Sequence, residues 1–219
     1  MIRFVLIATL WSLSFAIYCQ DQGLTEFEAD YQASLALYEE SKLLIAEESY
    51  EQAIDFLQQA HEFYKGSSDY TFAAAFALYK LDRLKEAAKK IQWSLNLEPF
   101  QSDYHVMAGN IAYKRMIYED AANFYSKALQ YQDSSEVAID DLGCIYNRGN
   151  CFLQLEQFKK AESDFSEVLT IDSLNYMAFH NRAQTRLRLN NLAGACEDFR
   201  LAINAGSEIS GKYLLKYCQ

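Results

Sequence analysis

The chain has 219 residues, of which 51% are apolar and 15% aromatic, with one proline and a formal net charge of −10 at pH 7. That apolar content can bury a core of one or two globular domains. The acidic balance, with no basic patch along the chain, argues against nucleic acid or an anionic membrane surface as a partner. The scarcity of proline and glycine favours an almost wholly helical protein.

The first residues have the pattern of a secretory signal peptide. Arg3 gives a short positive region, and residues 4–17 form an apolar stretch without a charge. Spanning a bilayer takes about 20 residues, so this stretch predicts a signal peptide over residues 1–19, cut near Cys19 and Gln20. Residues 20–33 are interpreted as an N-terminal extension.

Two alternatives remain open for this segment, a lipid anchor on Cys19 and an uncleaved membrane anchor. Lipoprotein signals usually place a small residue just before the cysteine, where this chain has Tyr18. We therefore expect export without a lipid, to the periplasm or cell envelope of a bacterium. A membrane is expected as a partner only if the chain stays anchored through its N-terminus.

An alanine recurs at a nearly fixed interval through the rest of the chain. The steps between successive alanines are 34, 34, 40 and 34 residues, and the alanines are Ala53, Ala87, Ala121, Ala161 and Ala195. A bulky apolar residue follows each by four positions: Leu57, Ile91, Tyr125, Phe165 and Phe199. A period in this range predicts a solenoid built from one repeated supersecondary unit.

Each repeat resolves into two helices. In the second repeat, residues 70–81 and 84–97 carry apolar residues at helical spacing, and Pro99 follows them. A small residue stands twelve positions before each alanine: Ser41, Ala75, Gly109, Gly149 and Ala183. Another stands seven positions after it: Ala60, Ser94, Ala128, Val168 and Ala202. Small residues let two helices cross tightly, so we expect the first set at the helix crossing and the second where the next repeat stacks.

These spacings divide the chain into five repeats and a tail. The repeats are 34–67, 68–101, 102–135, 142–175 and 176–206, and the 40-residue step leaves an acidic insertion at 136–141, which we interpret as a joint. The tail, 207–219, places Ile209, Tyr213, Leu214 and Leu215 on a short helix. Because a solenoid needs a cover for its last apolar face, this helix is predicted to be a cap.

Four cysteines lie beyond the signal peptide. Cys144 and Cys151 are seven residues apart in one predicted helix, about 10.5 Å along its axis, which is too far for a disulfide. Cys196 and Cys218 lie on consecutive elements and could meet. Helical solenoids do not need disulfide staples, so the preferred interpretation is that all four are buried free thiols.

The repeat pattern resembles that of tetratricopeptide repeat (TPR) proteins. The best match is the fourth repeat, Tyr146-Asn-Arg-Gly-Asn-Cys-Phe152, followed by Phe158, Ala161 and Phe165. The first repeat departs most, with Glu40 and Ser41 where Leu-Gly is usual. The resemblance implies an all-α, right-handed superhelical solenoid of antiparallel helix pairs, with about five repeats plus the capping helix.

The resemblance also implies a function, a non-enzymatic scaffold that binds a protein or extended peptide on its concave face. The family's contact positions fall in the early repeats on Tyr38, Lys42, Phe72, Phe76, Tyr79 and Lys80. In the later repeats they fall on Asn110, Tyr113, Lys114, Tyr146, Asn147, Asn150, His180, Asn181, Gln184 and Arg188. Asparagine inside a helix costs roughly 0.7 kcal/mol relative to alanine, so several on one surface favour binding of a peptide backbone. The plainer alternative is that these amides are merely solvated.

Two other roles stay open, an architectural subunit of a cell-envelope assembly and a co-chaperone-like receptor for a C-terminal peptide. A carboxylate receptor needs a cluster of basic residues, and Phe72 and Ala73 supply no partner for Lys42. Catalysis is not expected. The histidines show no metal-ligand spacing and there is no phosphate loop, so neither a metal nor a cofactor is predicted. Cys151 with a groove-facing His180 is the one imaginable thiol–imidazole pair.

Overall fold

The computed structural model describes residues 25–132 and 142–218, and every regular element in these ranges is an α-helix. The predicted signal peptide and the insertion at 136–141 lie outside them. The chain divides into two compact parts, an N-terminal unit up to Pro99 and a C-terminal unit from Phe100. The N-terminal unit contains α2 (Glu26–Ala46), α3 (Tyr50–Phe63), α4 (Ser68–Lys80) and α5 (Leu84–Leu97). The C-terminal unit contains α6 (Ser102–Lys114), α7 (Tyr118–Gln130), α8 (Leu142–Gln154), α9 (Phe158–Ile171), α10 (Tyr176–Arg188), α11 (Leu192–Asn204) and α12 (Glu208–Tyr217).

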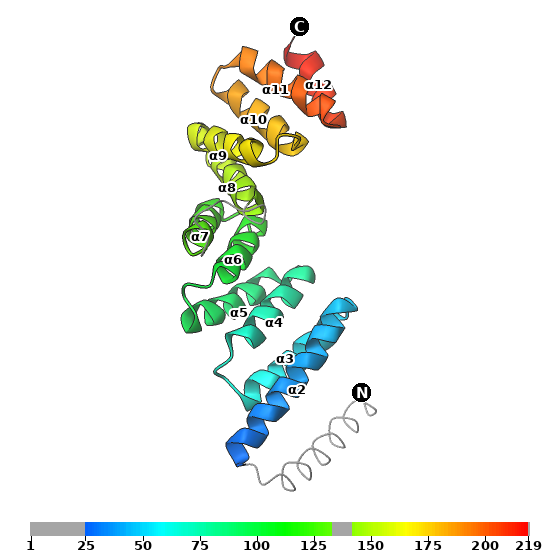
Figure 1. The fold of residues 1–219 in the computed structure, drawn as a ribbon, viewed down its shortest axis with the longest axis vertical. Helices are drawn as coiled ribbons and strands as arrows, with labels where there is room; N and C mark the ends of the chain where they lie inside the picture. Colours follow the sequence, from blue (N-terminus) through cyan, green and yellow to red (C-terminus); the bar gives the residue numbers. More distant parts are fainter. Residues whose placement is uncertain (1–24, 133–141, 219) are drawn as a thin grey trace. The chain divides into compact units, whose positions relative to one another are not determined.

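Within each unit the helices form antiparallel pairs (Figure 1). We call the first helix of a pair helix A and the second helix B. The pairs are α2–α3 and α4–α5 in the N-terminal unit, and α6–α7, α8–α9 and α10–α11 in the C-terminal unit. This arrangement confirms the predicted all-α class of stacked helix pairs.

The alanines of the repeat lie at the centre of these pairs. All five have no exposed surface: Ala53, Ala87, Ala121, Ala161 and Ala195. The small residues predicted on helix A are buried as well, and so are the five that follow the alanines by seven positions. The predicted burial of the repeat's small residues is therefore confirmed.

Two glycines show why helix A needs a small residue at the crossing. A Cβ added to Gly109 would lie 2.7 Å from the ring of Tyr125, and one added to Gly149 would lie 2.9 Å from the ring of Phe165. Both rings are essentially without exposed surface. The residue that fills the space above helix A is thus the aromatic four positions after the alanine, rather than the alanine itself.

The turn between helix A and helix B is the same in all five pairs. One residue that is not glycine has a positive φ, between 56° and 61°, in each turn: Glu48, Asp82, Met116, Glu156 and Asn190. The amide of the following residue donates to the carbonyl five positions earlier, as in Ile117 to Ala112 at 2.9 Å. This is the Schellman pattern of a helix end. It recurs at the steps of the alanines, although the sequence offers no glycine to mark it.

Helix α2 begins at Glu26, inside the segment interpreted as an N-terminal extension. Thr25 and Glu28 form a capping box, because the Thr25 hydroxyl accepts from the Glu28 amide at 3.3 Å and Glu28 accepts from the Thr25 amide at 2.8 Å. Such a box satisfies two amides that otherwise lack partners at a helix start. It fixes the start of a helix A that is longer than those of the other pairs.

Helix α12 covers the last pair. Tyr213 and Leu214 pack on the cluster of Ala183, Ala195 and Phe199. Ile209 and Leu215, placed by the sequence analysis on the same short helix, are 53% and 70% exposed. The cap is also held covalently, by a disulfide between Cys196 of α11 and Cys218.

The disulfide corrects the interpretation of all four cysteines as free thiols. The Cα atoms of Cys196 and Cys218 are 5.6 Å apart, within the range of a disulfide. Cys144 and Cys151 are buried, and neither forms a disulfide among the described residues. The repeat pattern could not predict this disulfide, because the bond joins the last repeat to the tail. The tail has no counterpart in the other repeats.

Replacing Ala121 with Leu tests the packing. The larger side chain has no space at a position without exposed surface, so we expect the free energy of unfolding to fall by roughly 1–3 kcal/mol. A denaturant titration measures it. The control is Ala193→Leu, at an exposed position near the start of α11, which should leave stability nearly unchanged. Equal stability of the two variants would contradict the described crossing.

Candidate peptide-binding face

A polar cluster joins two successive A helices of the C-terminal unit. The side-chain amide of Asn181 on α10 donates to the Tyr146 hydroxyl at 2.9 Å and to Oδ1 of Asn150 at 2.7 Å, both on α8. All three side chains are half-buried. The structure thus brings together three of the residues predicted for the concave face, and it fixes them against one another.

Two tyrosines of this face, Tyr146 of the cluster and Tyr113 of α6, pack against aromatic rings of their own helix pairs. Tyr146 packs against Phe165, with ring centroids 5.8 Å apart, and Tyr113 of α6 packs edge-on against Tyr118 at 5.5 Å. Burial raises the pKa of both Tyr113 and Tyr146, more than the amide hydrogen bonds to Tyr146 lower it. Both phenols are therefore neutral near pH 7 and can donate or accept.

Asn110 and Asn147 differ in how much of their hydrogen-bonding capacity is already used within the protein. Oδ1 of Asn110 accepts from the buried hydroxyl of Tyr125 at 2.7 Å, which ties Asn110 to the core. Asn147 is half-buried, and its side chain has no hydrogen-bond partner among residues 25–132 and 142–218. An amide can make up to four hydrogen bonds, so Asn147 keeps all of its capacity for a ligand.

The remaining predicted residues do not belong to this polar cluster. Lys114 and Arg188 are exposed at the ends of α6 and α10. In the N-terminal unit Phe72 and Tyr79 are half-buried, and Phe76 packs against Tyr50 with Lys80 5.2 Å from its ring.

His180 is not on an open face, which corrects the sequence analysis. It is 7% exposed, and Nδ1 lies 2.8 Å from the hydroxyl of Ser210 on α12. Its Nε2 lies 2.6 Å from the side-chain nitrogen of Gln184. Because that nitrogen only donates, Nε2 accepts and Nδ1 carries the proton. The register of the repeat placed His180 correctly on helix A, but the covering helix α12 lies outside the repeat.

Arginine–aspartate pairs that the sequence analysis missed hold helix A on helix B in the last two pairs. Arg148 makes two hydrogen bonds to Asp164, at 2.9 and 2.8 Å, and Arg182 makes two to Asp198, at 2.9 and 2.7 Å. Both aspartates are buried. Burial alone would lower the pKa of Arg148, but Asp164 raises it. Such paired contacts also fix orientation, so they set the rotation at which α8 presents Tyr146 and Asn147.

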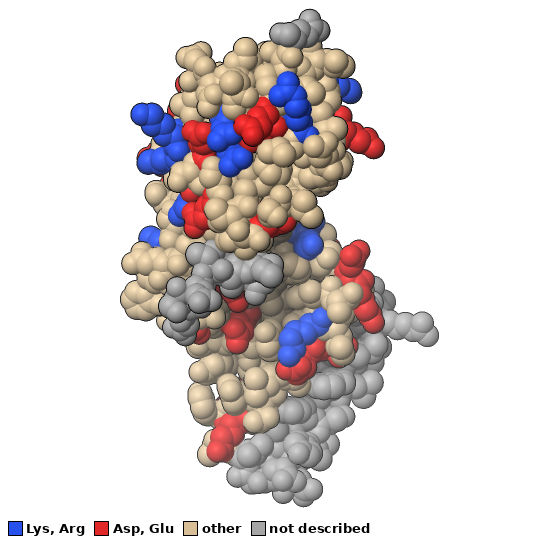
Figure 2. Space-filling view, turned by 45° about the horizontal axis from the view of Figure 1, so that its top comes forward, with Lys and Arg blue, Asp and Glu red and all other residues tan. Residues whose placement is uncertain are grey.

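The signal for these pairs was in the sequence. Arg148 and Arg182 are one repeat apart, as are Asp164 and Asp198. Arg186 joins the second pair through Asp198 at 2.9 Å and reaches Glu162 at 2.7 Å. In the upper part of the face drawn in Figure 2, positive and negative side chains lie beside one another.

The thiol–imidazole pair has no support in the geometry. Cys151 has no exposed surface, and burial raises its pKa to about 12, so its thiol stays protonated near pH 7. His180 is engaged by Ser210 and Gln184. Among the described residues, no group of His, Cys, Asp and Glu side chains is arranged to hold a metal ion. In the same ranges no helix has both the length and the apolar character to cross a membrane.

Known proteins share this architecture. Residues 142–173 match the model of the tetratricopeptide repeat. The Hsp70/Hsp90 co-chaperone cns1 of Schizosaccharomyces pombe is 32% identical over 93 residues, which are 42% of this chain and 25% of that protein. The chain thus spans about a quarter of the length of the curated relatives it matches.

Solved structures agree in fold. The TPR protein YrrB, described as having an unusual peptide-binding site, superposes with a TM-score of 0.77 at 18% identity, covering 92% of this chain and 97% of its own. PilW, described as a type IV pilus biogenesis factor, superposes with a TM-score of 0.65 at 18% identity over 80% of this chain and 78% of its own. The chain therefore has the fold of a TPR solenoid.

Acid should loosen the end of the C-terminal unit through His180. Burial lowers the pKa of His180, so its contribution is fully present above the unfolded pKa of about 6.5. It is lost as the pH falls through the lower folded pKa. We expect urea midpoints to fall on acidification, and to fall less in His180→Gln.

A second variant makes the same change at His61, whose pKa is also lowered by burial and by Lys90 and Lys65. The two variants should each remove part of the acid response. An unaltered pH dependence in His180→Gln would contradict the buried, neutral state of His180.

Proposed function

We propose that this TPR protein is a non-enzymatic scaffold that binds an extended peptide segment of another protein on the A helices of its C-terminal unit. The observation that carries the proposal is the cluster of Tyr146, Asn150 and Asn181, fixed across α8 and α10. A preorganised polar surface beside aromatic rings loses little entropy on binding. The description of YrrB as a peptide-binding TPR protein supports this use of the fold.

Each group on this face has a role that its surroundings allow. Asn147 can donate to and accept from a peptide backbone, since its side-chain amide has no partner among the described residues. Oδ1 of Asn181 also has no donor among the described residues, whereas its nitrogen is engaged. Tyr113 and Tyr146 supply ring faces of the kind that anchor interfaces, and the exposed Arg188 supplies a charge at the margin.

A receptor for a C-terminal peptide is the second candidate, favoured by the similarity to the co-chaperone cns1. A carboxylate terminus needs several converging cations. In the N-terminal unit Lys42 is already paired with Glu39 at 2.7 Å. Peptides that differ only in a free or an amidated C-terminus separate the two candidates, because only a terminal receptor distinguishes them.

An architectural subunit of an envelope assembly is compatible with the same surface. The likeness in fold to PilW supports that alternative. A scaffold that binds peptides exchanges them in solution, whereas an architectural subunit copurifies with its assembly.

Export to an oxidising compartment is part of the proposal. The N-terminal pattern of residues 1–19 motivates it, and the disulfide between Cys196 and Cys218 supports it. Disulfides persist outside the cytoplasm and are rare in reducing compartments.

Changing Asn147 and Asn181 together to Ala should weaken peptide binding about 10- to 100-fold, from the loss of about 1 kcal/mol or somewhat more for each amide. Helicity should be unchanged, because Ala is the better helix former. Fluorescence anisotropy with a peptide taken from a captured partner measures the affinity.

The matched control changes Asn123 and Asn204 to Ala, since both are exposed on B helices of the same unit. Lys127→Ala, also exposed on α7, is a second control. Weaker binding in the controls, with normal binding in the paired change, would place the working surface on the B helices.

The exported form should begin near Gln20 and carry no lipid. Its intact mass should also be lower by the two thiol hydrogens lost when Cys196 and Cys218 pair. Mass spectrometry under non-reducing conditions tests both points. Acyl chains on Cys19 would overturn the proposal of soluble export, and a retained Met1 would indicate a membrane anchor.

A further inference from the structure

The N-terminal unit contains a pocket of about 270 Å³ that the repeat pattern does not predict. It lies between the first half of α2, the turn from α3 to α4, and the end of α5. Its lining residues are Tyr31, Leu35, Tyr38, Tyr64, Gly66, Ser67, Ser68, Asp69, Tyr70 and Glu98. Pockets for drug-sized ligands usually have about 300–1,000 Å³, so this one suits a small group.

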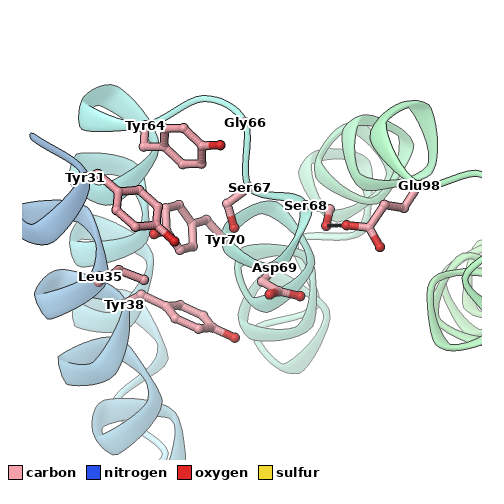
Figure 3. Close-up of a pocket in the computed structure, with 10 residues that line it drawn as sticks. All are labelled: Tyr31, Leu35, Tyr38, Tyr64, Gly66, Ser67, Ser68, Asp69, Tyr70 and Glu98. Atoms are coloured by element: carbon pink, nitrogen blue, oxygen red, sulfur yellow. Dashed lines mark hydrogen bonds between the residues drawn. The ribbon is translucent and has the colours of Figure 1, made fainter. Parts of the chain in front are cut away.

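One side of the pocket is aromatic. Figure 3 shows the rings of Tyr31, Tyr64 and Tyr70 gathered on this side, with Tyr38 below them. Tyr31 meets Tyr64 edge-on at 5.1 Å, and Tyr38 lies 5.0 Å from Tyr70. The rings are held in place, since Tyr70 is 2% exposed and its hydroxyl lies 3.0 Å from that of Ser34.

Gly66 leaves space for the Tyr64 ring, which lies against it at the pocket. A Cβ at this position would lie 2.7 Å from the end of the Tyr64 ring. Any larger residue would therefore displace the ring from the pocket. The placement of the aromatic wall depends on this glycine.

The opposite side carries negative charge. Figure 3 shows the Tyr38 hydroxyl directed toward Asp69, with Glu98 beyond it hydrogen-bonded to Ser68. No lysine or arginine is among the lining residues. The negative charge of Asp69 also acts on two neighbouring groups. Burial raises the pKa of Tyr38, and Asp69 raises it further. The hydrogen bond to Glu39 raises the pKa of Lys42, and Asp69 contributes to this rise.

The pocket wall already attracts a cation. The Lys42 ammonium lies 5.0 Å from the centre of the Tyr38 ring. Ring faces attract ammonium groups within about 6 Å, and cages of aromatic rings recognise alkylated ammonium ions. Tyrosine rings on one side and a carboxylate on the other, with no lysine or arginine among the lining residues, are therefore suited to a positive charge with an apolar surface.

We infer that this pocket binds an organic ammonium group, with Tyr31, Tyr38 and Tyr64 around its apolar surface and Asp69 opposite its charge. Two sources share this chemistry, a free quaternary ammonium compound and a methylated lysine side chain of a protein. The inference is independent of the peptide face, which lies in the other unit.

Titration of the full chain with choline, followed by NMR of labelled tyrosine rings, tests the inference. Saturable shifts are expected for rings of the pocket. The neutral isostere 3,3-dimethylbutanol has the same shape without the charge, and it should bind at least about 10-fold more weakly. Equal affinity for the two compounds, or no saturable shift with choline, would overturn the inference.

Variants locate the site. Asp69→Asn should weaken choline binding about 5- to 10-fold, whereas Asp103→Asn should not change it. Asp103 is the matched control, because it is exposed at the second position of α6, one repeat after Asp69 at the second position of α4. Gly66→Ala should also weaken binding, through displacement of Tyr64. Circular dichroism verifies folding, and choline binding that survives both Asp69→Asn and Gly66→Ala would place the site elsewhere.

The two sources are separated by a second titration. A short peptide with trimethyllysine is compared with the same peptide carrying unmodified lysine and with choline alone. Tighter binding of the trimethylated peptide than of choline assigns the pocket to a protein ligand, and the reverse order assigns it to a free compound. Failure of all three would refute the inference, while the Asn147 and Asn181 experiment would be unaffected.

Discussion

The close approach of two helices at small residues is the contact on which each pair depends. An alanine without exposed surface on helix B, as at Ala121 or Ala161, brings the helices near enough for an aromatic ring to lie over helix A. Gly109 and Gly149 have no space for a Cβ because those rings, of Tyr125 and Phe165, occupy it. Packing of this density tolerates little change in volume.

That geometry also determines which side chains helix A presents to solvent. Once the ring of Phe165 is seated, Tyr146 packs against it, and its hydroxyl receives the amide of Asn181 from the next helix A. The pairing of Arg148 with Asp164 restrains the rotation of α8. A polar surface on a packed helix is thus positioned by core contacts on the helix's other sides, as a preorganised site requires.

The fold was predictable from the sequence because one periodicity determined burial, pairing and class together. The candidate binding face was predictable only in part. The position within the repeat places Asn110 and Asn147 on helix A, but it does not reveal that the Tyr125 hydroxyl already donates to the side-chain Oδ1 of Asn110. Features outside the repeat were missed for a physical reason. The burial of His180 and the disulfide at Cys218 depend on a tail without counterparts, and the tyrosine pocket depends on contacts specific to the first two pairs.

The disulfide makes the two ends of the C-terminal unit unequal. In a stack whose members touch only their neighbours, the outermost members open first, because each lacks one partner. The bond across the 22-residue separation of Cys196 and Cys218 opposes opening at one end, by about 3 kcal/mol on the loop-entropy account. The pair α6–α7, at the start of the same unit, has no such bond among its described residues. Opening of the C-terminal unit under mild stress therefore has a direction, and a protease cuts this unit first around α6 and α7.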